Sequence, residues 1–181
     1  MVFGFYDNLT SRQQSIYRQS DEIKYLRLAE TSHLTALANE LVETLPSENK
    51  KAVEKICQAI VDSINKQFNA PPLQLQVLAV RPSADWGELH GLYLPEDDGE
   101  LAKIQVWMRT AKNKKIVAFK SFLRTVLHEL CHHLDYEHFG FPETFHTEGF
   151  YSRESSLFKQ IYIPKENAGD EPAFFNLHLV C

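Results

Sequence analysis

The chain has 181 residues, 44% of them hydrophobic and 24% charged, which excludes a disordered or fibrous protein and favours a single domain over residues 1–181. Its formal net charge of −5 gives no general attraction for polyanions, so nucleic-acid binding is not expected. The three cysteines, Cys57, Cys131 and Cys181, lie far apart and form no CxxC pair, which excludes a zinc ribbon or knuckle and argues against a disulfide framework.

The N-terminal stretch MVFGFYDNLT lacks the basic start, the apolar segment and the cleavage site of a secretory signal. No stretch of the sequence is long and apolar enough to span a membrane. Together with the few cysteines, this predicts a cytoplasmic protein without a membrane partner. The sequence gives no indication of the oligomeric state.

Two amphipathic helices are predicted in residues 1–70. Between Ser20 and Leu45, leucine and isoleucine recur mostly every three or four residues, which is the period of one helical face. Pro46 ends this helix. A second helix begins with Ser47 as its N-cap and buries a stripe of valine and isoleucine up to Phe68.

The period changes to two after residue 72. Leu73–Val80 alternates between apolar and polar side chains, as a half-buried strand does, and residues 102–110 (AKIQVWMRT) alternate in the same way. Between them, Gly91–Leu94 (GLYL) is followed by a turn at Pro95–Gly99. These segments predict a hairpin or small sheet, mixed or antiparallel, with Gly91–Leu94 as an edge strand.

The helical period returns from about Val117 to His138, where apolar residues form a broad face for the core. The other side of this helix carries small or polar residues spaced four and three apart: Ser121, Thr125, His128, His132 and Asp135. A final helix is predicted from about Thr147 to Ile161, and residues 162–181 are predicted to be an irregular tail. The fold class is therefore α+β.

The polar side of this helix contains the motif HELCH, in which His128 and His132 lie about 40° apart and one turn along the helix. That spacing lets both imidazoles bind one Zn²⁺ ion. Glu129 lies beside the first ligand, where its carboxylate can take a proton from a water molecule at the metal. The HExxH pattern therefore predicts two zinc ligands and a general base.

A catalytic zinc ion requires a third protein ligand. His138 completes HExxHxxDxxH, which resembles the metzincin pattern HExxHxxGxxH, but Asp135 stands where those enzymes break the helix at a glycine. On an unbroken helix, His138 would point about 80° away from His128. Glu148 and Glu154 are further candidates, in an arrangement of the gluzincin type.

The stretch HTEGFYSRESSLF resembles the SprT-like and related minimal zincin metallopeptidases. In these enzymes a short loop after HExxH delivers a histidine, and an aromatic pair then opens the next helix; the matching residues here are His146, Phe150 and Tyr151. Upstream, HGLYLP at residues 90–95 resembles the edge strand that precedes their active-site helix.

This resemblance covers Leu73–Ile161, roughly the central half of the chain. It implies a zincin-like fold with its catalytic core at residues 71–161, zinc as the cofactor and His146 as the third ligand. A role in repairing DNA–protein crosslinks is not carried over, because the chain lacks the zinc ribbon and the basic tail of the enzymes that have it.

These residues predict a zinc-dependent metallopeptidase in which Glu129 is the general base acting on a zinc-activated water molecule. The edge strand would bind a peptide or protein substrate through backbone hydrogen bonds. Two alternatives stay open: a zinc hydrolase that acts on amides other than peptides, and a zinc-binding protein of the same fold without turnover.

Residues near the motif carry further expectations. Asp135 either accepts a hydrogen bond from a ligand histidine or serves as a cap or surface charge. His133 points about 140° away from His128 and is interpreted as non-ligating, and Cys131 is interpreted as a small buried side chain. For Tyr151 and Arg153, core packing or a surface ion pair is preferred to stabilisation of an oxyanion.

Overall fold

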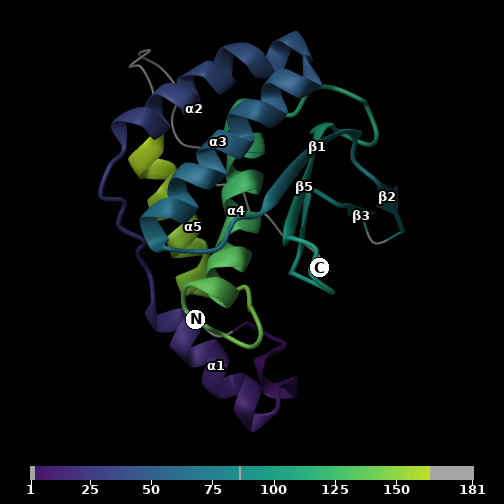
Figure 1. Ribbon diagram of the computed structural model, residues 1–181. Coiled ribbons are helices and arrows are strands. Elements are labelled where there is room, and N and C mark those ends of the chain that lie inside the picture. Colours follow the sequence, from purple (N-terminus) through teal and green to yellow (C-terminus); the bar gives the residue numbers. More distant parts are fainter. Residues whose placement is uncertain (1–2, 86, 164–181) are drawn as a thin grey trace.

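The computed structural model describes residues 3–85 and 87–163, which form an α+β fold with five α-helices and a small mixed sheet (Figure 1). Helices α3 and α4 pack against the sheet, and α2 and α5 pack against these two helices on the side away from it. None of the helices in these residues has the length and apolar content needed to cross a membrane.

The helices are α1 (Ser11–Glu22), α2 (Ser32–Thr44), α3 (Lys50–Phe68), α4 (Phe119–Glu137) and α5 (Glu148–Ile161), with 3-10 turns at Tyr6–Asn8 and Leu45–Ser47. The strands are β1 (Gln74–Val80), β2 (Ser83–Ala84), β3 (Gly87–Glu88), β4 (Gly91–Leu94) and β5 (Lys103–Arg109). The predicted strands and the two C-terminal helices thus agree with the observed ones to within two residues. Most of the predicted tail lies outside the described residues.

The continuous helix predicted from Ser20 to Leu45 is wrong, since α1 ends at Glu22 and residues 23–31 form no helix. The backbone of this stretch bonds to side chains of α5 and, at Ala29 and Glu30, to Gln67 of α3 instead. Ser156 Oγ accepts the Leu26 N–H at 3.0 Å, and Gln160 Nε2 donates to the Leu26 carbonyl at 2.7 Å. Contacts with an element far away in the sequence therefore override the local helical period.

The predicted N-cap of the second helix is also wrong. Ser47 ends a 3-10 turn, and Glu48 then adopts a left-handed backbone conformation with φ 61°. Asn49 is the cap of α3, because its Oδ1 accepts the Ala52 N–H at 3.2 Å. This helix ends at Phe68, the last residue of the predicted buried stripe.

The sheet has the strand order β1-β5-β4 and is mixed, one of the two arrangements that the sequence left open. β1 runs parallel to β5, with Val77 opposite Val106, and β4 runs antiparallel to β5, with Tyr93 opposite Ile104. The face that carries Val77, Ile104 and Val106 is buried beneath α3 and α4. β4 is therefore an edge strand that lies next to α4.

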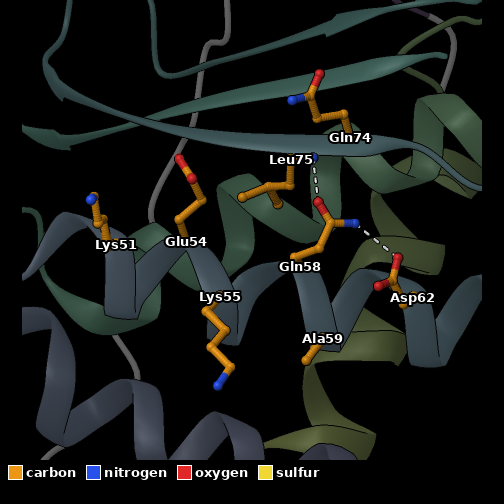
Figure 2. Close-up of a pocket in the computed structure, with 8 residues that line it drawn as sticks. All are labelled: Lys51, Glu54, Lys55, Gln58, Ala59, Asp62, Gln74 and Leu75. Atoms are coloured by element: carbon orange, nitrogen blue, oxygen red, sulfur yellow. Dashed lines mark hydrogen bonds between the residues drawn. The ribbon is translucent and has the colours of Figure 1, made fainter.

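The two edges of the sheet differ. The outer edge of β1 is covered by α3: the Leu75 N–H donates to Gln58 Oε1 at 2.6 Å, and the Val77 N–H donates to Glu54 Oε2 at 2.9 Å. Figure 2 shows Gln58 between this strand and Asp62, to which its Nε2 donates at 2.8 Å. No described strand pairs with the outer side of β4. Among the described residues, β4 is therefore the open edge of this sheet.

The cover over β1 predicts a stability effect. Gln58→Ala should lower the free energy of unfolding by about 1–2 kcal/mol, because the Leu75 N–H and the Leu73 carbonyl lose their partner. Urea unfolding followed by circular dichroism measures the change. Lys55→Ala, at an exposed position of the same helix, is the control and should stay within about 0.5 kcal/mol of the wild type. Equal stability of the two variants would contradict this role of Gln58.

Candidate metal centre

Three histidines converge at one point between α4 and α5. His128 and His132 come from successive turns of α4, and His146 comes from the loop that precedes α5. The Nε2 atom of His146 lies 2.9 Å from Nε2 of His128 and 3.1 Å from Nε2 of His132. Among the described residues these three are grouped closely enough to hold a metal ion, since their ligand atoms all lie within 4.8 Å of one another.

The three Nε2 atoms are better arranged to bind a cation than to hydrogen-bond to one another. The Nε2 atom of His146 faces two other ring nitrogens, and a single proton can bridge only one of these two pairs. Three imidazoles bound to a tetrahedral zinc ion at about 2.0–2.1 Å would place their nitrogens roughly 3.3 Å apart, close to the separations here. A cation between the three rings would satisfy all three nitrogens at once.

Burial favours the neutral, ligating form of two of these rings. Burial and the neighbouring His128 lower the pKa of His146 to about 3. The pKa of His132 is also well below its usual range, because of burial first and then the nearby His128 and His146. A neutral imidazole offers the lone pair that a metal ion needs.

Hydrogen bonds at the opposite ring nitrogens orient two of the ligands. His128 Nδ1 lies 3.4 Å from Glu154 Oε2, and that carboxylate is paired with Arg124 at 2.9 Å. His132 Nδ1 lies 2.9 Å from Thr144 Oγ1, which in turn donates to Asp135 Oδ2 at 2.8 Å. Such partners fix the tautomer that leaves Nε2 free for a metal.

Two acidic residues near the cluster have positions that the sequence did not predict. Glu154, a candidate third ligand, is the partner of His128 and lies outside the cluster of converging ligand atoms. Asp135 reaches His132 through the hydroxyl of Thr144 and also pairs with Arg153 at 2.8 Å. Sequence reasoning missed Thr144, because an isolated threonine in a loop carries no spacing signal.

The structure brings His146 to the cluster and leaves His138 away from it. α4 continues unbroken through Asp135, so His138 at its C-terminal cap faces another direction and its Nδ1 lies 3.0 Å from the Phe68 carbonyl oxygen. His146 is set in a tight turn, in which the Thr147 N–H donates to the Phe145 carbonyl at 2.8 Å. Thr147 then caps α5 by accepting the Phe150 N–H at 2.9 Å.

Aromatic rings enclose the three imidazoles. The Phe150 ring lies 4.9, 4.7 and 5.1 Å from the rings of His128, His132 and His146, measured between centroids. Tyr151 stacks on His146 at 5.8 Å with an interplanar angle of 22°. The aromatic pair at the start of α5 therefore packs directly on the candidate metal ligands.

Glu129 lies under the edge strand. A Cβ atom at Gly91 would come within 2.3 Å of Glu129 Oε1 and 2.7 Å of Thr125 Cγ2, so any larger residue at this position of β4 would displace these side chains. Burial, reinforced by Glu154, raises the pKa of Glu129 to about 7, although His128 and the Tyr93 backbone N–H act in the opposite direction. A carboxyl group with this pKa can both accept and release a proton at neutral pH.

The residues interpreted as having no metal role are engaged elsewhere. His133 is fully buried, and its two ring nitrogens lie 3.2 Å from the Tyr93 hydroxyl and 3.0 Å from the Pro71 carbonyl oxygen. Cys131 is buried, as expected. Arg153 does form an ion pair, with Asp135, but both side chains are fully buried, so the expected surface position of this pair is wrong. The link from Tyr93 to His133 was missed, since its partners lie on different elements.

Comparisons of this chain with protein-family profiles, with curated proteins and with solved structures found no match.

Metal analysis tests the choice of ligands. The wild type should hold roughly one zinc ion per chain after purification without chelators, and its melting temperature should rise when zinc is added to the metal-free form. His146→Ala should lose most of the metal, because one of the three converging nitrogens is removed. His138→Ala should keep it. Metal loss in the His138 variant, together with retention in the His146 variant, would reverse this assignment.

The buried neutral histidines also predict a pH dependence of the metal-free protein. The folded-state pKa of His146 is about 3, below about 6.5 in an unfolded chain, so the unfolded state binds more protons between these values. The contribution of His146 to the free energy of unfolding should therefore be greatest above about pH 6.5 and should fall as the pH is lowered toward 3.

Urea titrations in EDTA at about pH 7 and about pH 5 measure this change in the wild type and in His146→Gln. The variant lacks the imidazole and should lose less stability than the wild type over the same interval. An equal loss in the two proteins would show that His146 does not contribute.

Proposed function

We propose that this chain is a zinc-dependent metallopeptidase of zincin-like fold, which hydrolyses peptide bonds with Glu129 as the general base. One observation carries the proposal: three converging imidazole nitrogens lie next to a buried carboxyl group, and both lie beside the open edge of the sheet. The position of HExxH on α4, under an antiparallel edge strand, supports the resemblance to SprT-like zincins.

Zinc is the metal that suits this donor set. Three imidazole nitrogens with one position left for water are a usual ligand set of catalytic zinc sites. When bound there, zinc would act as a Lewis acid and lower the pKa of a water molecule. His128, His132 and His146 would hold it, with Glu154 and Thr144 keeping two of these rings in the ligating tautomer.

Glu129 moves the proton. Its carboxylate would accept a proton from the attacking water and pass it to the leaving amine, which is the work of a single group acting first as base and then as acid. A pKa of about 7 suits both steps at neutral pH. The absence of a side chain at Gly91 leaves room for the Glu129 carboxyl group under the strand.

The substrate class follows from the open edge. An extended peptide would add to β4 through backbone hydrogen bonds, and its backbone would then lie next to Glu129, which contacts Gly91 of this strand. The other edge of the sheet is covered by Gln58 and Glu54. A peptide or protein segment in extended conformation is therefore the substrate we propose.

Glu129→Gln tests the mechanism. The variant should retain zinc and lose hydrolysis by about 10²–10⁴-fold, because the amide cannot accept the proton. Cleavage of a broad peptide library, followed by mass spectrometry, measures activity, and metal content is determined on the same samples. A fully active Glu129→Gln protein would refute the mechanism. Wild-type protein that holds zinc and cleaves only small amides, or nothing, would replace the peptidase by a zinc amidohydrolase or by a binding protein.

A further inference from the structure

An N-terminal arm, residues 3–22, lies against the segment that carries His146. Figure 1 shows α1, the helical part of this arm, at the lower end of the molecule, away from α2 and α3. Its main helical neighbour is α5. We call residues 143–151 the His146 segment, since they include the histidine and the first turn of α5.

Three side chains of the arm contact this segment. Gln13 Nε2 donates to Glu143 Oε2 at 2.8 Å. The ring of Tyr17, which is 1% exposed, lies 6.1 Å from the ring of Phe145, the residue before His146. Phe3 lies 6.2 Å from Tyr151, measured between ring centroids. The arm thus touches the His146 segment at three points along its length.

The C-terminal end of α1 interlocks with the start of α5. Asp21 Oδ1 accepts the Gly149 N–H at 2.8 Å. A Cβ atom at Gly149 would lie 2.5 Å from the carbonyl oxygens of Ser20 and Asp21, so the two backbones are in close contact. Arg153 donates to the Ser20 carbonyl at 2.6 Å and also forms an ion pair with Asp135 Oδ1. The other carboxylate oxygen of Asp135 accepts a hydrogen bond from Thr144. The arm is therefore connected to the hydrogen bonds that orient His132.

The His146 segment needs such support because much of it has no regular secondary structure. His128 and His132 are held by the backbone hydrogen bonds of α4, whereas residues 138–147 form a loop. A loop that can move places its ligand at the metal only part of the time, and ordering it costs conformational entropy. Contacts that hold the loop in advance reduce that cost and strengthen metal binding.

We infer that Gln13 and Tyr17 are positioning residues of the metal centre, which hold the segment that supplies its third ligand. The inference rests on the metal binding proposed above but not on peptide hydrolysis. It places part of the affinity for the metal in a region of the chain far from HExxH in the sequence.

The test compares zinc dissociation constants, measured by competition with a chromophoric chelator, for the full chain. Gln13→Ala and Tyr17→Leu should each weaken zinc binding by about 10-fold, and the double variant by up to about 100-fold. Gln14→Ala is the matched control: its side chain donates to the carbonyls of Tyr6 and Leu9 within the arm, and it should bind zinc as the wild type does.

Thermal unfolding of the metal-free proteins shows below which temperature all variants are folded. The zinc dissociation constants are compared below that temperature. A merely structural arm would lower the melting temperature of the metal-free variants and leave the zinc dissociation constant unchanged, which would overturn the inference. Wild-type protein that binds no metal would instead contradict the proposed function, and the inference would fall with it.

Discussion

The structure depends on three imidazole rings, two buried and one partly buried, whose Nε2 atoms point at one another. Buried polar groups are costly unless each finds a partner, and these three nitrogens cannot all satisfy one another with protons. Two of the rings are oriented by contacts at their Nδ1 atoms, His128 by Glu154 and His132 by Thr144. Those partners come from α5 and from the loop before it, so the cluster determines how α5 must pack on α4.

α5 connects this cluster to the rest of the chain. Glu154 reaches His128, Arg153 joins Asp135 to the end of α1, and Gln160 bonds the backbone near Leu26. On the other side of α4, the sheet presents one covered edge and one open edge, and Glu129 lies under the open one. The same helix thus presents two histidines toward α5 and a carboxyl group toward the strand, and the proposed hydrolysis of extended peptides rests on this arrangement.

Local patterns predicted most of the regular structure. The alternation in β1 and β5 and the helical periods of α4 and α5 agree with the observed bounds to within two residues. The prediction failed between Ser20 and Leu45, where leucines recur at helical spacing although the backbone of residues 23–31 bonds to side chains of α5 and α3. A periodic pattern shows which residues are apolar and should be buried. The backbone conformation that buries them depended here on contacts with helices far away in the sequence.

The sequence by itself determined the pair His128 and His132 and the place of Glu129 between them, because spacing along a helix places side chains by geometry alone. His146 was reached only through resemblance to a family. Its position at the cluster, the partners Thr144 and Glu154, and the fit of Gly91 over Glu129 were decided by tertiary structure. These contacts join residues on different elements, and no local period encodes the distance between two elements that meet only when the chain is folded.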